Sequence, residues 1–364
     1  MKKNNGNRRG LSKAAKSGFI NYGIVIAVFA IIQILLVVQK QAHVTLISNA
    51  LQSLLVPACC YIVMAVSLNL TVGILGELSL GHAGFMSLGA FSGIVASILL
   101  QDVIPFAPVR LAIAMIVGAA FGALGGVIVG VPVLRLQGDY LAIVTLAFGQ
   151  IIKNVIMVLY VGVDDTGFHM SASSERFHMA EDGTAIIKGP MGAVGVTKLA
   201  SFTAGFVLIL ITLFIVQNLV NSRSGRAIMA LRDNRIAAES VGINVTKYKL
   251  MAFVTSAALA GASGALFGLN YSSTVSSKFD FNTSILVLVF VVLGGLGSIR
   301  GSIIAAALLY ILPEMLRSLG DIADYRMLIY AIILILVMLV TNNDQLKALV
   351  GRIIPKRKGA ASNG

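Results

Sequence analysis

The sequence predicts an all-α polytopic membrane protein with about ten transmembrane helices. Of its 364 residues, 57% are hydrophobic and only 12% are charged, whereas a soluble domain carries about 25% charged residues. The mean hydropathy is +0.91, and many apolar runs approach the roughly 20 residues that cross a bilayer as a helix. A transmembrane β-barrel would instead show short segments of alternating polarity.

The predicted spans follow one another along most of the chain. Their approximate ranges are 19–38, 46–72, 85–100, 111–131, 141–161, 202–220, 250–270, the two halves of 285–316, and 327–340. The run 285–316 is predicted to split at the glycine-rich stretch 294–301. With this split, both ends of the chain and most Lys and Arg residues lie on the cytoplasmic side, as the positive-inside rule requires.

The remaining segments complete the predicted domain organisation. Residues 1–18 form a basic cytoplasmic arm, residues 19–345 form the transmembrane domain, and residues 346–364 form a basic cytoplasmic tail. Within the transmembrane domain, 162–198 is an external loop and 221–249 is a cytoplasmic loop. The net charge of +13 is therefore interpreted as a topology signal for a protein in lipid, and no nucleic-acid partner is expected.

The polar segment 221–249 is much longer than a turn between two spans needs. Its middle, 227–242, predicts an amphipathic helix, because Ile228, Leu231, Ala238 and Val241 fall on one helical face. Gly242 can end this helix, since glycine accepts a left-handed cap. Two interpretations stay open from the pattern alone: a surface that docks a partner protein, or a helix that lies on lipid headgroups.

Two glycine-rich interruptions, 73–84 and 294–301, occur in the two halves of the chain. Non-helical backbone at membrane depth persists only where protein or a water-filled cavity satisfies its polar groups. Paired interruptions of this kind therefore indicate a transport path. In the second interruption, Gly294, Gly295 and Gly297 are the candidate residues of the path.

The first interruption contains Glu77, Ser79 and His82. Ionisable groups at membrane depth cost about 2.5–3.5 kcal/mol on insertion scales, which makes those that occur candidates for function. These three side chains either line the substrate path or hold a re-entrant turn together by hydrogen bonds.

The fifth predicted span contributes two further candidates. Asp139 is expected to complement the dipole at the start of this helix and to cap its free N–H groups. Thr145 lies deeper along the same span. It is expected either to line a polar path or to bond another helix.

Catalytic and metal-binding patterns do not appear in the sequence. The four histidines lack metal-ligand spacing, and the adjacent Cys59 and Cys60 are interpreted as small apolar side chains. The phosphate-binding pattern Gly-x-x-x-x-Gly-Lys-Ser/Thr is also missing. An active transporter with this sequence would take its energy from an ion gradient or from a partner ATPase.

Four segments in order resemble the permeases of branched-chain amino acid ABC transporters. They are 76–90, which begins Gly-Glu-Leu-Ser-Leu-Gly-His-Ala-Gly, 134–149, which begins Leu-Arg-Leu-Gln-Gly-Asp-Tyr, 224–244, and 292–301, which reads Val-Leu-Gly-Gly-Leu-Gly-Ser-Ile-Arg-Gly. The Leu-x-Gly-Asp-Tyr sequence is more similar to the LivM type than to the LivH type. The loop 162–198 departs from the family pattern by its length and polarity.

The resemblance implies a fold like that of the vitamin B12 importer permease, in the cytoplasmic membrane of a bacterium. It implies two cytoplasmic ABC ATPases, a second, LivH-like permease and an extracellular or periplasmic solute-binding protein. ATP would bind to the ATPases, with no cofactor on this chain. The segment 227–242 would be the coupling helix. The implied coupling residues are Gly225, Arg226, Leu231, Ala238, Glu239 and Gly242.

The resemblance implies ATP-driven import of branched-chain or other hydrophobic amino acids. Relatives that carry urea, short amides or another small solute share the same signatures. A secondary transporter driven by an ion gradient is the alternative from another class, and it would need ionisable residues within several spans.

Overall fold

The computed structural model describes residues 13–42, 48–133, 139–164, 167–174, 177, 183–317 and 325–342. Most of the predicted basic arm, the turn 134–138 and the whole of the predicted tail lie outside these residues. The chain divides into two units, residues 1–307 and residues 308–364. All sites discussed below belong to the first unit.

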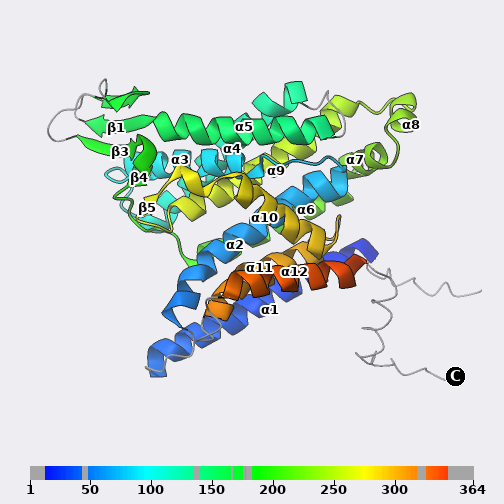
Figure 1. The fold of residues 1–364 in the computed structure, drawn as a ribbon, viewed down its shortest axis with the longest axis horizontal. Helices are drawn as coiled ribbons and strands as arrows, with labels where there is room; N and C mark the ends of the chain where they lie inside the picture. Colours follow the sequence, from blue (N-terminus) through cyan, green and yellow to red (C-terminus); the bar gives the residue numbers. More distant parts are fainter. Residues whose placement is uncertain are drawn as a thin grey trace, which may run out of the picture. The chain divides into compact units, whose positions relative to one another are not determined.

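Long helices make up most of the described chain, which confirms the predicted class (Figure 1). They are α1 (Lys13–Ala42), α2 (Asn49–Asn69), α3 (His82–Leu99), α4 (Ala107–Val133), α5 (Asp139–Val158), α6 (Phe202–Asn221), α9 (Val245–Gly268), α10 (Phe281–Gly294), α11 (Ile299–Arg317) and α12 (Arg326–Asn342). Nine helical segments within the described residues are long and apolar enough to cross a bilayer. The 17-residue α12 occupies the tenth predicted span.

The predicted split of the run 285–316 is confirmed, because α10 and α11 are separate helices. Between them, Gly295 and Gly297 have φ values of +92° and +81°, which L side chains rarely adopt. The backbone therefore reverses at these two glycines.

The first unit has its tightest packing where α3, α4 and α9 meet. A Cβ atom added at Gly89 of α3 would lie 2.0 Å from the carbonyl oxygen of Gly261 of α9. At Gly264, an added Cβ atom would lie 1.9 Å from the carbonyl oxygen of Met86. Small residues let the backbones approach this closely, as is typical of membrane helices.

A five-stranded antiparallel sheet is built from the predicted loop 162–198, residues just before it and a short strand after α9. Its strands are β1 (Tyr160–Asp164), β2 (Gly167–Ser171), β3 (Thr184–Lys188), β4 (Ala193–Val194) and β5 (Ser273–Thr274), in the order β2-β1-β3-β4-β5. The fold is therefore helical with one small sheet that the sequence did not predict. In Figure 1 the sheet lies at one end of α5, and the short helices α7 (Arg223–Asp233) and α8 (Arg235–Ser240) lie at the other.

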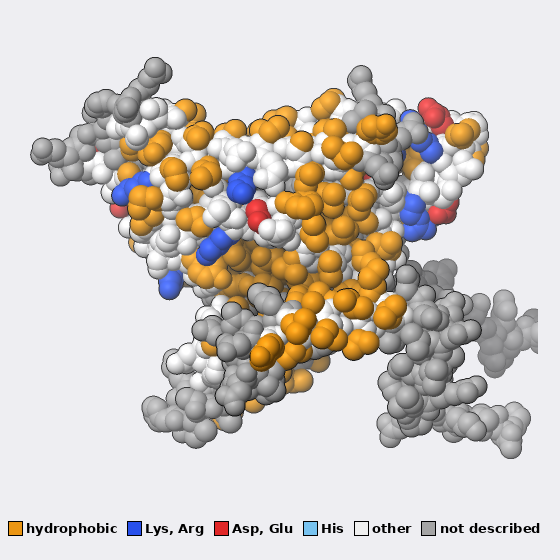
Figure 2. Space-filling model, viewed as in Figure 1, with side chains coloured by type: hydrophobic (Ala, Val, Ile, Leu, Met, Phe, Trp, Pro, Cys, Tyr) orange, Lys and Arg blue, Asp and Glu red, His pale blue; other side chains and the backbone are white. Residues whose placement is uncertain are grey.

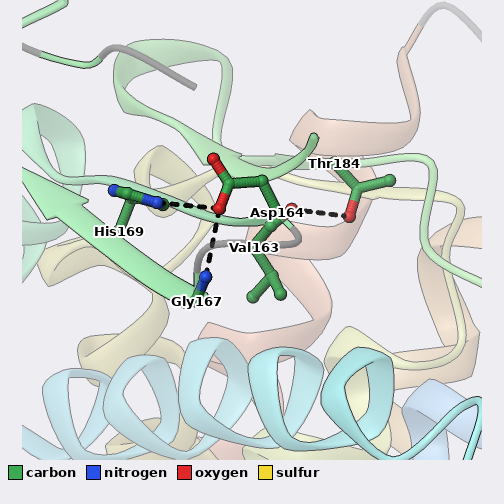
Figure 3. A network of polar contacts seen from close by, with 5 residues as sticks. All are labelled: Val163, Asp164, Gly167, His169 and Thr184. Atoms are coloured by element: carbon green, nitrogen blue, oxygen red, sulfur yellow. Dashed lines mark hydrogen bonds and ion pairs between the residues drawn. The ribbon is translucent and has the colours of Figure 1, made fainter. Parts of the chain in front are cut away.

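The hairpin of β1 and β2 is closed by a polar network (Figure 3). Asp164 Oδ1 accepts hydrogen bonds from the backbone N–H of Gly167, at 3.1 Å, and contacts His169 Nε2 at 2.9 Å. Thr184 of β3 donates to the carbonyl oxygen of Val163 at 3.5 Å. These contacts hold β2 and β3 on either side of β1.

Candidate functional site: the two breaks and the α7–α8 segment

The first break begins where α2 changes its winding. The helix continues beyond Asn69 as a π-helix, Leu70–Leu75, and ends at Gly76, whose φ is +81°. Residues 76–81 are not helical, and α3 begins at His82. π-Turns inside membrane helices often mark functional positions.

The two glycine-rich breaks contact each other. Asn69 Oδ1 accepts a hydrogen bond from the N–H of Gly297 at 2.8 Å, and Asn69 Nδ2 donates to Ser302 Oγ at 3.0 Å. A Cβ atom added at Gly73 would lie 2.2 Å from the nitrogen of Gly297. At Gly294, an added Cβ atom would lie 2.4 Å from the carbonyl carbon of Gly301. Of the three candidate glycines, Gly297 therefore forms a close backbone junction with the end of α2, whereas Gly294 packs against Gly301 at the start of α11.

An ion pair fixes the first break to α9. Glu77 Oε1 pairs with Lys249 Nζ, and the two side chains are only 14% and 5% exposed, respectively. The sequence singled out Glu77 but gave no partner for it. The two residues are 172 positions apart, so no local pattern could have paired them.

His82 and Thr145 bond neighbouring segments. His82 Nε2 lies 2.8 Å from Ser67 Oγ of α2, and Thr145 Oγ1 of α5 accepts the N–H of Leu80 at 3.1 Å. These two contacts join the start of α3 to α2 and the first break to α5. Ser79 Oγ is buried and has no hydrogen-bond partner within the described residues. Asp139 is the first residue of α5, and its side chain lies outside the described structure.

The predicted continuous helix 227–242 is wrong, because two helices, α7 and α8, cover this region. The chain leaves helical geometry at Asn234, with φ −156° and ψ 105°. Its Oδ1 accepts the N–H of Ala237 at 3.0 Å and so caps α8. Gly242 has φ +85°, as expected for a glycine that follows a helix.

The α7–α8 segment, residues 223–240, buries most of its predicted apolar face. Ile228, Leu231 and Ala238 are 1%, 5% and 5% exposed. Leu231 and Ala238 pack in one cluster with Val245, at the start of α9. The expectation for Val241 is wrong, since its side chain is 76% exposed. The helix α8 ends at Ser240, so Val241 no longer lies on a helical face with Ala238.

Some of the implied coupling residues are exposed and others are buried within the chain. Gly225 lies against the end of α6, where an added Cβ atom would be 2.2 Å from the carbonyl oxygen of Val220. Arg226, Glu239 and Gly242 are exposed, whereas Leu231 and Ala238 are buried. Figure 2 shows charged side chains gathered over α7 and α8.

Arg232 joins the α7–α8 segment to the first break. Its Nη1 donates to the carbonyl oxygen of Gly73 at 3.0 Å, while its Nε and Nη2 contact Asp233 Oδ1 at 3.2 and 3.1 Å. Sequence reasoning named neither Arg232 nor Asn69 as a site residue. Together, Arg232, Lys249 and Asn69 connect α7, α9 and both breaks at one end of the bundle.

Broken membrane helices that meet at a polar junction beneath a folded polar segment are the architecture of a multi-pass membrane permease. Residues 50–338 match the protein family described as "Branched-chain amino acid transport system / permease component". The chain belongs to this family.

Three bacterial proteins are among the relatives. The chain is 32% identical over 292 residues to the "High-affinity branched-chain amino acid transport system permease protein LivM" of Salmonella typhimurium, with 77% of this chain and 66% of the relative covered. It is 31% identical to the LivM protein of Escherichia coli, with the same coverage. The "Ribose import permease protein RbsC" of Escherichia coli is 30% identical over 78% of this chain and 82% of the relative. The match thus spans just under two thirds of the length of the LivM proteins.

Proposed function

We propose that this chain is a permease subunit of an ATP-driven ABC importer that moves branched-chain amino acids across the bacterial cytoplasmic membrane. The observation that carries the proposal is the bond from Arg232 of α7 to Gly73 in the first break, which the Asn69 junction joins to the second break. Movement of this segment by a partner would reach the broken helices directly. The likeness to the LivM proteins supports the choice of substrate.

The burial of its apolar face favours a protein partner for the α7–α8 segment. A helix lying on headgroups keeps its apolar face open to lipid, but Ile228, Leu231 and Ala238 are buried within the chain. The side chains of Ile236 and Val241 remain 81% and 76% exposed. We assign contact with a cytoplasmic ABC ATPase to the exposed Arg226 and Glu239, and a shape-holding role to Gly225, Leu231, Ala238 and Gly242.

The proposed assembly contains two such ATPases, a second, LivH-like permease and a solute-binding protein on the outer side. ATP would be bound and hydrolysed by the ATPases, and this chain would need no cofactor of its own. The ribose permease among the relatives favours, as the second candidate, an importer of another small solute with the same mechanism. In either case Glu77 and His82 would hold the break in shape beside the path.

A purification tests the assembly directly. The tagged chain, extracted in mild detergent, should bring with it a second permease and ABC ATPase subunits, identified by mass spectrometry. Purification of the chain alone, together with solute uptake driven by a proton or sodium gradient, would contradict the proposal.

The proposed orientation places the sheet outside the cell and the α7–α8 segment inside. Ser174 and Ser240 are exposed residues of these two regions. In intact cells, a membrane-impermeant maleimide should label Ser174→Cys, and it should label Ser240→Cys only after permeabilisation. The parent chain is the control, because its Cys59 and Cys60 are buried. Labelling of both variants from the same side would overturn the orientation.

A further inference from the structure

An apolar pocket of about 470 Å³ lies between α3, α4, α5 and one face of the sheet. Leu99 of α3 and Phe121 of α4 form part of its helical wall, and Phe168 and Met170 of β2 form part of its sheet wall. The hydroxyl of Ser92, also in the wall, donates to the carbonyl oxygen of Leu88 in its own helix at 2.7 Å. The pocket therefore offers an occupant almost no hydrogen-bonding group.

The pocket needs an apolar occupant. Phe168, Met170 and Phe121 are 53%, 67% and 48% exposed. The pocket is partly open to its surroundings, and an apolar lining with almost no polar group favours an apolar occupant over water. The proposed function leaves the pocket unused, because the breaks and the α7–α8 segment lie at the other end of the helices (Figure 1).

A buried cation lies on the same helical face as the pocket. Arg110 precedes the pocket residues Val117 and Phe121 by seven and eleven positions on α4, spacings that bring all three to one side of a helix. Arg110 is only 6% exposed. In the described part of the chain its Nε has no hydrogen-bond partner, and no carboxylate forms an ion pair with it.

A buried guanidinium that has no ion-pair partner within the described residues would be stabilised by an anion. Burying a charge is costly unless it is paired, and the planar fork of arginine matches phosphate in two-pronged contacts. Arg110 lies near the start of α4, about 10 Å along the helix from Val117, and so toward the sheet end. A cation on the same helical face as an apolar pocket, and nearer the end of the helix, matches a phospholipid, whose phosphate is attached to acyl chains.

We propose that this pocket is a phospholipid-binding site of the leaflet at the sheet end, with one acyl chain in the pocket and the phosphate on Arg110. A transmembrane helix of a second permease is the other conceivable occupant. A helix packed over the pocket would bring no phosphate to Arg110.

The test uses the full chain reconstituted in vesicles of equal parts phosphatidylethanolamine and phosphatidylglycerol, then re-extracted for native mass spectrometry. The wild-type chain should retain a bound phospholipid through delipidation. Arg110→Gln should bind it about tenfold more weakly, as expected for the loss of a charged hydrogen bond. Val95→Phe, which fills the pocket, should also lose it, whereas Val127→Phe should not, because Val127 lies on α4 outside the pocket. Equal retention in all four chains would overturn the proposal.

A crosslinking arm identifies the occupant even if a variant fails to fold. A benzoylphenylalanine in place of Phe121 should, on illumination in membranes, form an adduct with lipid. An adduct with a second permease would overturn the proposal in favour of a subunit interface.

Discussion

Glu77→Ala is expected to destabilise the folded chain by about 3–5 kcal/mol, the usual effect of removing one partner of a buried ion pair. Lys249 is 5% exposed in its pair with Glu77, and in the variant it would stay buried without a counter-charge. The unfolding midpoint in mild detergent, followed by circular dichroism or by thiol reactivity of Cys59 and Cys60, measures the effect.

Two variants make the test of this ion pair specific. The exchange Glu77→Lys with Lys249→Glu should recover much of the lost stability, since it restores opposite charges. Asp233→Ala removes a carboxylate that is 69% exposed in its pair with Arg232, and exposed pairs contribute only about 0–1 kcal/mol. If Glu77→Ala melts like the wild type, the ion pair does not hold the first break to α9.

Arg232→Ala is expected to uncouple ATP hydrolysis from uptake while the chain remains in the membrane. The variant loses the charged hydrogen bond to the carbonyl oxygen of Gly73, which connects α7 to the first break. Such bonds are worth about 1.5–3 kcal/mol, so solute moved per ATP should fall about tenfold or more. The measurement compares uptake and phosphate release in the same proteoliposomes.

The matched control for this variant is Arg223→Ala. Arg223 begins the same helix and is exposed, and within the described residues no hydrogen bond joins its side chain to either break. This control should keep the wild-type ratio of uptake to hydrolysis. Equal uncoupling in both variants would mean that the bond to Gly73 is not what couples ATP hydrolysis to uptake.

Hydrophobic runs predicted the long helices, whereas the glycine-rich stretch 294–301 and the positive-inside rule predicted the split between α10 and α11. Boundaries were less accurate where polar residues open a helix. The run 285–316 was predicted from residue 285, but α10 begins at Phe281, because Asp280 caps it by accepting the N–H of Thr283 at 3.0 Å. The apolar pattern cannot detect a helical turn that is built on a side-chain cap.

The α7–α8 segment shows why local pattern failed in its second half. The side chain of Asn234 accepts the N–H of Ala237 and so starts a second helix, and asparagine is strongly favoured at such N-cap positions. The sheet was missed for another reason. Its β5 strand, Ser273–Thr274, pairs with β4, Ala193–Val194, across about 80 residues of chain, although the β-branched residues of β1 and β3 are a signal that could have indicated strands.

The candidate site was predicted in its parts but not in its connections. Glu77, His82 and the glycines of both breaks were named from the sequence, whereas Asn69, Arg232 and Lys249 were not. Each of these three residues forms a hydrogen bond or ion pair with a residue more than 150 positions away along the chain. Such contacts depend on how the helices pack against one another, and local sequence patterns do not indicate this packing.

Leucine uptake by the reconstituted importer tests the central claim most directly. Vesicles containing this chain with its co-purified subunits should accumulate radiolabelled leucine only when ATP and the solute-binding protein are both supplied. Arg232→Ala vesicles should hydrolyse ATP and accumulate little leucine. Uptake that proceeds without ATP on a proton or sodium gradient, or that is unchanged by Arg232→Ala, would contradict the account of an ATPase acting through the α7–α8 segment on the two breaks.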